Sequence, residues 1–251
     1  MAGSAKSIET PEIELEFPPN SWHAANSAIM LDIATESAHK LSRAFSLPWR
    51  EQTTCYVTDP HTAMDIQGVT GAAYNHMVII GVDEGHLSDY ARTVVHELAH
   101  ILSQQVGKYE CKFKGEGFAC FANWLLDPNA ITGGLPLHYH LVWMRSVGID
   151  CSLEYLWHRK DYTCEIYDLA WSFAAFCVER YGLDRYMKLY ASEGSDLQSR
   201  IKSSLREDIR LVEREWHSLA EGRIEVPVSE IPRMDRHAGF ICSRAAWVRG
   251  Q

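Results

Sequence analysis

The chain has 251 residues, with 24 Lys and Arg against 33 Asp and Glu and with 46% hydrophobic residues. This composition is typical of a folded globular protein with a buried core, and it excludes a fibrous or largely disordered chain. The acidic balance argues against a nucleic-acid partner, because binding a phosphate backbone requires clustered Lys and Arg. No apolar stretch approaches the roughly 20 residues that a membrane span requires.

The two ends of the chain differ in composition from its middle. Residues 1–11 are small, polar and charged without an apolar signal core, so we expect a flexible start and a cytoplasmic protein. Residues 222–251 contain Pro227 and Pro232 and predict an extended tail, with one strand at 224–228. No repeat or linker divides the chain, which predicts a single domain over 1–251. The seven cysteines, an odd number without a Cys-x-x-Cys pair, favour reduced thiols.

The first part of the chain mixes strand and helix patterns. Apolar and acidic residues alternate over 13–17, which predicts a half-buried strand. Apolar residues then recur at helical spacing over 24–45, and Pro48 closes this segment. Two short runs, 54–58 and 76–82, predict further strands because they are bounded by turn residues.

From residue 88 onward helical patterns dominate. Ser88 is placed to cap a helix that ends near Gly107, and a second helix is expected over 115–126. Four further helices are predicted at 137–147, 165–181, 183–191 and 207–221. A small mixed sheet followed by a mostly helical C-terminal part predicts an α+β fold.

The segment Val-His-Glu-Leu-Ala-His at 95–100 carries the clearest chemistry. In a helix His96 and His100 are one turn apart on the same side, so both imidazoles can reach one ion. Glu97 is rotated by about 100° and can reach a water on that ion without binding the ion itself. Two imidazoles suit one Zn²⁺, with Glu97 as general base. The alternative is that both histidines are ordinary core or surface residues of the helix.

A zinc site of this kind needs a third protein ligand. A metzincin arrangement is excluded, because Ser103 and Val106 occupy positions that would have to be Gly and His. Glu116 is the favoured candidate, since a buried Glu is costly unless it meets a cation and flanking glycines let two helices approach closely. Weaker candidates are Glu110, Asp127, Cys111 and Cys120.

His-Glu-Leu-Ala-His followed by Glu-Gly-Phe-Ala resembles the gluzincin metallopeptidases, the thermolysin-like and M1 aminopeptidase-like group. The resemblance extends over about 54–216 and implies a thermolysin-like catalytic core. It implies that His96, His100 and Glu116 hold zinc while Glu97 activates water. Tyr-Asp-Leu-Ala from Tyr167 is similar to the helix start that carries that group's transition-state tyrosine, which implies that the Tyr167 hydroxyl binds the oxyanion. The alternative is a Tyr packed on the core.

A second element of resemblance lies upstream. Gly-Ala-Ala-Tyr-Asn at 71–75 is similar to the Gly-Ala-Met-Glu-Asn element of M1 aminopeptidases, which implies that Ala73, Tyr74 and Asn75 contact the substrate. Tyr74 stands where those enzymes carry the Glu that captures a free amine. The resemblance therefore does not extend to amino-terminal exopeptidase specificity.

Two further features are candidates for binding substrate. His138 and His140 lie in a segment expected beside the cleft, although lone histidines are more often surface or core residues. The strand at 77–82 is a candidate sheet edge to which an extended peptide could add. An ordinary core strand is the alternative.

Three functions therefore stay open. The first is zinc-dependent hydrolysis of a peptide bond by water that Glu97 activates. The second is the same zinc core acting on a non-peptide amide or a biosynthetic intermediate, and the third is a binding protein without turnover. We expect a peptide or small amide as partner, and neither nucleic acid nor membrane. The sequence does not predict the oligomeric state.

Overall fold

The computed structural model describes residues 5–67, 71–108, 110–128, 137–159, 164–194 and 196–224. The chain divides into two compact units, Met1–Gln105 and Val106–Gln251. We call them the sheet unit and the helical unit, after their described elements. Strands and helices in these proportions confirm the predicted α+β class.

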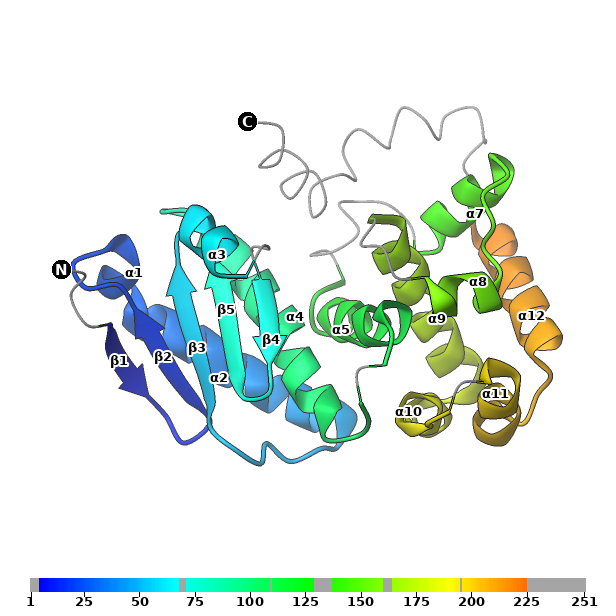
Figure 1. The fold of residues 1–251 in the computed structure, drawn as a ribbon, viewed down its shortest axis with the longest axis horizontal. Coiled ribbons are helices and arrows are strands. Elements are labelled where there is room, and N and C mark those ends of the chain that lie inside the picture. The colour runs from blue at the N-terminus through cyan, green and yellow to red at the C-terminus, as the bar shows by residue number, and fades with distance from the viewer. Residues whose placement is uncertain are drawn as a thin grey trace. The chain divides into compact units, whose positions relative to one another are not determined.

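The sheet unit is built on a five-stranded mixed sheet in the order β1-β2-β3-β5-β4 (Figure 1). The strands are β1 (Lys6–Glu9), β2 (Ile13–Phe17), β3 (Thr53–Thr58), β4 (Gly71–Tyr74) and β5 (Met77–Gly81). β2, β3 and β5 run parallel, whereas β1 and β4 pair antiparallel at the two edges. The predicted alternation in β2 is confirmed, since Ile13, Leu15 and Phe17 are buried.

The described helices of the sheet unit accompany these strands. They are α1 (Trp22–Ala25), α2 (Ser27–Phe45), α3 (Pro60–Gln67) and α4 (Leu87–Gln104). The two long helices, α2 and α4, pack against each other and against the strands (Figure 1). The buried Tyr90 hydroxyl of α4 donates a hydrogen bond of 3.0 Å to the Met30 carbonyl of α2. This bond helps to fix α4, the helix that carries the two candidate histidine ligands.

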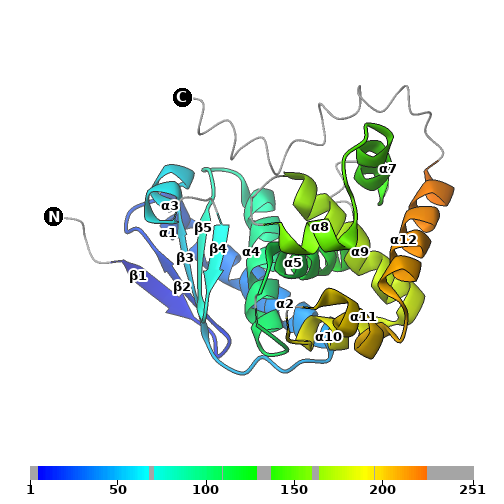
Figure 2. The same cartoon turned by 45° about the vertical axis from the view of Figure 1, so that its right-hand side comes forward.

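The helical unit is centred on two helices, α5 and α9, which pack along each other (Figure 2). Its described helices are α5 (Lys112–Leu126), α7 (Tyr139–Ser146), α8 (Leu153–His158), α9 (Cys164–Tyr181), α10 (Leu183–Ala191), α11 (Leu197–Leu205) and α12 (Ile209–Arg223). Gly117 of α5 allows the close approach, because a β carbon there would stand 2.8 Å from the Ala170 carbonyl oxygen of α9. Gly117, one of the two glycines beside Glu116, therefore allows the close contact between α5 and α9.

Several predicted elements need correction. The run at 77–82 is not a sheet edge, because β5 lies between β3 and β4, and the edge strand is β4. β1 lies within residues 1–11, which were expected to be a flexible start, and no element was predicted at the positions of α3, β4, α8 or α11. Of the strand predicted at 224–228, all but residue 224 lies outside the described residues, and so does most of the predicted tail. Within the described residues, no helix combines the length and the apolar character needed to cross a membrane.

Candidate metal centre

His96 and His100 lie on the same side of α4, as the four-residue spacing predicts. Their Nε2 atoms are 3.2 Å apart, and the two rings meet at 83°. Two imidazole nitrogens that share one tetrahedral Zn²⁺, with bonds of about 2.0–2.1 Å, stand about 3.3 Å apart. The two side chains therefore already have the separation that a shared ion requires.

The packing of α4 fixes this pair of rings. Val94 and Leu98 are fully buried, and His100 is 9% exposed, whereas His96 is half-buried. One face of α4 therefore packs into the core of the sheet unit, and His96 lies at the edge of this face. An ion held here would be partly shielded from water and still reachable by a ligand.

Glu97 is buried next to the histidine pair, with 5% of its surface exposed. Its carboxylate lies against Gly71, the first residue of the edge strand β4. The general-base candidate is therefore positioned between α4 and the outer strand of the sheet.

Glu116 lies in α5, which is buried on all sides from Phe113 to Asn123. A helix with apolar residues all around belongs to the centre of its unit, and a carboxylate there is costly without a compensating cation. Glu116 is 5% exposed. One possible ligand atom from each of His96, His100 and Glu116 lies within 4.8 Å of the other two.

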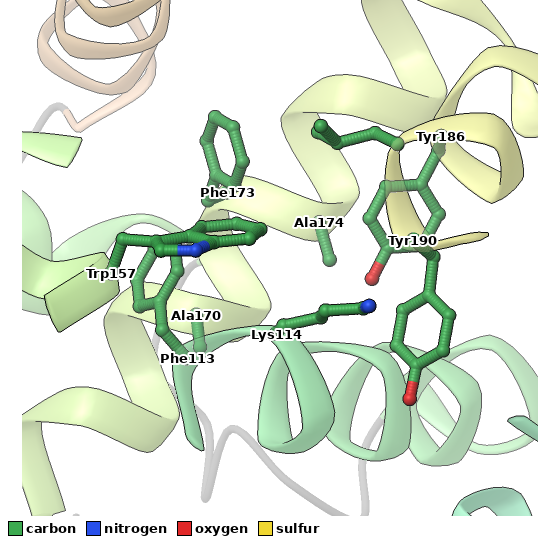
Figure 3. Close-up of a pocket in the computed structure, with 9 residues that line it drawn as sticks. Phe113, Lys114, Trp157, Ala170, Phe173, Ala174, Tyr186 and Tyr190 are labelled. Carbon is green, nitrogen blue, oxygen red and sulfur yellow. The ribbon is translucent and has the colours of Figure 1, made fainter. Parts of the chain in front are cut away.

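The weaker ligand candidate Glu110 is engaged elsewhere. Its Oε2 accepts a hydrogen bond of 2.6 Å from Arg200 Nη1 and lies 3.5 Å from Lys114 Nζ. Both cations are buried, with side-chain exposures of 4% and 2%. Figure 3 shows the Lys114 amine between the rings of Tyr186 and Tyr190, and its Nζ is 4.8 Å from the Tyr190 ring centre. Glu110 is thus the counter-ion of two buried cations.

The remaining ligand candidates are also less suitable. Burial raises the pKa of the Cys111 thiol, which disfavours the thiolate that a metal requires. Cys120 is buried in α5, and Asp127 is an exposed residue at the end of that helix. None of the three belongs to a group of potential ligands in the described parts of the chain.

Tyr167 and His140 belong to neighbouring helices, α9 and α7. Tyr167 is half-buried in the first turns of α9. The next residue, Asp168, places its Oδ2 2.9 Å from Nδ1 of His140. This carboxylate fixes the orientation of the His140 ring.

His138 lies deeper, in the core of the helical unit. It is 3% exposed, and its Nδ1 is 2.6 Å from the Ser172 hydroxyl, which also accepts a hydrogen bond of 3.0 Å from Trp216 Nε1. Burial, assisted by the charge of Arg223, lowers the pKa of His138 to about 4. The ring is therefore neutral at neutral pH and joins α7 to α9.

The three candidate substrate-binding residues lie at the edge of the sheet. Ala73 and Tyr74 belong to β4, and Asn75 has a left-handed φ of 53° in the turn to β5. Tyr74 is 52% exposed. Among the strands that the structure describes, β4 pairs with β5 alone, so its outer backbone groups face away from the sheet.

Sequence reasoning did not identify Asp168 and Ser172, or the contact of Gly71 with Glu97. Asp168 directly follows Tyr167, so the quoted Tyr-Asp-Leu-Ala motif contained a usable signal. Asp168 and Ser172 both belong to α9, whereas the histidines that they contact lie in or directly before α7. No spacing rule connects residues of two different helices.

Comparison with protein-family models gave no match, and no curated protein matches the chain.

Proposed function

We propose that this chain is a zinc-dependent hydrolase that cleaves a peptide bond or a related amide at His96, His100 and Glu116. The observation that carries the proposal is the separation of 3.2 Å between the two Nε2 atoms on α4. The same separation also suits an N–H···N hydrogen bond between the two rings, so the added proximity of a Glu116 ligand atom is what favours a shared ion.

The donor set supports zinc as the metal. Two imidazoles and one carboxylate are a known catalytic combination that leaves a coordination position for water. Glu116 is the third ligand in this proposal, because one of its possible ligand atoms lies within 4.8 Å of those of both histidines and a carboxylate oxygen is a common zinc ligand. The same donors can also hold iron, so the identity of the metal is part of the test.

The order of the elements supports a gluzincin-like core. An outer antiparallel strand, β4, and β5 precede the helix with the His-Glu-x-x-His pattern, and the candidate third ligand comes from the next helix, α5. This order is what the resemblance to thermolysin-like and M1-like enzymes implies. Within this proposal, residues 1–251 form a single domain.

The protein's own residues then perform the chemistry. Bound zinc would polarise the scissile carbonyl and lower the pKa of a water to about 7. Glu97 takes a proton from the attacking water as its oxygen bonds to the carbonyl carbon, and it delivers that proton to the departing nitrogen as the C–N bond breaks. The Tyr167 hydroxyl, in the role that the resemblance implies, donates a hydrogen bond to the carbonyl oxygen.

The edge strand is suited to an extended substrate. A peptide can add to β4 by backbone hydrogen bonds, which orient it without demanding particular side chains. The carboxylate of Glu97 lies against the first residue of this strand. A substrate held along β4 would therefore pass the general base.

Metal analysis of the purified protein is the first experiment. The proposal predicts one zinc per chain, reduced binding in His96→Ala and retained binding in Glu97→Gln. A chain that takes up no zinc, or that carries stoichiometric iron instead, would contradict the proposal. A metal-free binding protein would give the first of these results.

Turnover separates the remaining possibilities. The zinc-loaded protein is tested against a quenched-fluorescence peptide library and a panel of small acyl amides. Chelation should abolish hydrolysis, zinc should restore it, and Glu97→Gln should lower the rate by roughly 10²–10⁴-fold. Cleavage of peptides supports the first function, and cleavage of the amides alone supports a non-peptide substrate. Zinc without hydrolysis would indicate a binding protein.

A further inference from the structure

We propose that Gly71 is a positioning residue for Glu97, and that its missing side chain is what lets the general base take its place. This inference rests on the proposed function. It concerns a contact within the sheet unit, between the first residue of β4 and the metal helix α4.

The backbone of Gly71 does not itself require glycine. Its φ lies outside the left-handed region, and it pairs regularly with Ile80 of β5. In such a strand glycine is less favourable than Ala, because it loses more backbone freedom on folding. The reason for glycine must therefore be the space that a side chain would occupy.

That space is filled by the Glu97 carboxylate. A β carbon at position 71 would stand 2.6 Å from Glu97 Oε1 and 3.0 Å from Thr93 Cγ2. The first distance is well inside van der Waals contact, so even one methyl group would displace the carboxylate. Glu97 is 5% exposed, so the displaced carboxylate would have to take a new position among buried neighbours.

The nature of the obstructing atom distinguishes this glycine from Gly117. At Gly117 a β carbon would meet the backbone carbonyl of Ala170, at 2.8 Å, and the helix pair itself would have to separate. At Gly71 it would meet a carboxylate oxygen at the end of the Glu97 side chain, which can rotate, and the Cγ2 methyl of Thr93, which has to shift slightly. An alanine at 71 should therefore leave the fold intact and move the catalytic carboxylate, whereas an alanine at 117 should destabilise the fold.

The test compares Gly71→Ala with two matched variants. Gly117→Ala has the backbone obstruction, and Gly222→Ala places its β carbon in open space in α12. We expect Gly71→Ala to keep its melting temperature and its zinc while kcat falls roughly tenfold or more with little change in KM. Gly117→Ala should melt at a lower temperature, and Gly222→Ala should keep wild-type activity. Unchanged kcat in Gly71→Ala would overturn the inference.

A double-mutant cycle shows whether Gly71 acts through Glu97. In a Glu97→Gln background, the further change Gly71→Ala should cost no additional rate, because the group it positions has already been removed. A further loss of tenfold would mean that position 71 acts on the substrate directly, and the inference would fail.

A crystal structure of Gly71→Ala provides a readout that does not depend on activity. We expect β4 to keep its pairing with β5 while the Glu97 carboxylate moves to a new rotamer. If the carboxylate stays in place and the strand moves instead, the inference is wrong even if the protein is a hydrolase. If the carboxylate moves but the wild-type protein hydrolyses nothing, the proposed function fails and the positional relationship stands.

Discussion

His96 and His100 hold their Nε2 atoms 3.2 Å apart on one face of α4, with their rings nearly perpendicular. Both rings are supported by a helix whose opposite stripe is buried against the sheet. Because an ion can be bound by both nitrogens with little rearrangement, binding should cost little conformational entropy.

Removing one of these rings should therefore weaken metal binding strongly. His96→Ala leaves one imidazole and is expected to lower zinc affinity at least 100-fold, measured by competition with a chromophoric chelator. The control is His39→Ala, an exposed residue of α2 that pairs with Glu12 on the surface. Equal zinc affinity in these two variants would contradict the assignment of His96.

Glu116 and Glu110 offer a second comparison, because both are carboxylates in or next to α5. Glu116→Gln keeps the shape of the side chain and removes its charge, so zinc affinity should fall by an order of magnitude or more. Glu110→Gln should leave zinc affinity unchanged, since Glu110 is bound to Arg200 and Lys114. The reverse pattern would transfer the role of third ligand to Glu110.

The contacts of Glu110 with Arg200 and Lys114 also predict an effect on the stability of the fold. Glu110→Gln leaves two buried cations without a carboxylate and should lower the free energy of unfolding by about 2–3 kcal/mol. Lys114→Met keeps the Arg200 pair and should be neutral or stabilising by up to about 1 kcal/mol. Urea titration of both variants measures the difference. A large loss in Lys114→Met would show that the amine stabilises the fold.

The buried amine of Lys114 should also make the free energy of unfolding depend on pH. Burial, the largest influence, lowers the pKa of its amine in the folded state. The unfolded chain then binds more protons near that pKa, so the contribution of this group to stability rises with pH. Lys114→Met lacks this contribution. The difference in unfolding free energy between wild type and variant should therefore shift in favour of the wild type as pH rises.

The lowered pKa of His138 predicts a loss of stability at acidic pH. Its folded pKa of about 4 lies below the ordinary value of 6.5, mainly because of burial. Between these values the unfolded chain binds the extra proton, so stability is lost as pH falls from 6.5 towards 4. The loss amounts to about 3 kcal/mol at most.

His138→Asn is the matched control for that titration. Asn can keep a hydrogen bond to Ser172, and it tolerates the left-handed φ of 76° at this position. The metal-free variant should lose less stability than the metal-free wild type between pH 6.5 and 4, measured by urea titration. Parallel curves for the two proteins would refute the buried neutral histidine.

The sequence predicted the long elements best, because their signal is periodic. The helix expected over 88–107 is α4, Leu87–Gln104, and alternation over 13–17 is β2. The four-residue histidine spacing belongs to the same kind of local regularity. A pair of ligands on one helix needs no knowledge of the tertiary fold.

The edges of the sheet could not be predicted in this way. β1 is Lys-Ser-Ile-Glu and β4 is Gly-Ala-Ala-Tyr, and neither shows a clear alternation of apolar residues. Backbone pairing with β2 and β5 holds them. The prediction that 77–82 forms an edge was wrong because Val78, Ile79 and Ile80 form a continuous buried run, which is typical of a central strand.

Contacts between helices could not be predicted from the sequence either. The pairs His140–Asp168 and His138–Ser172 each join α7 to α9, and their members are 28 and 34 residues apart in the chain. Glu116 could be proposed as a ligand from its chemistry alone. The engagement of Glu110 with two buried cations became visible only in the folded unit.

X-ray absorption at the zinc edge, on protein loaded with one equivalent of zinc, examines the coordination sphere itself. The account predicts two imidazole nitrogens and light oxygen ligands at about 2.0–2.2 Å, with one imidazole lost in His96→Ala and one oxygen ligand altered in Glu116→Gln. A sphere containing sulfur, or one that is unchanged in both variants, would contradict it.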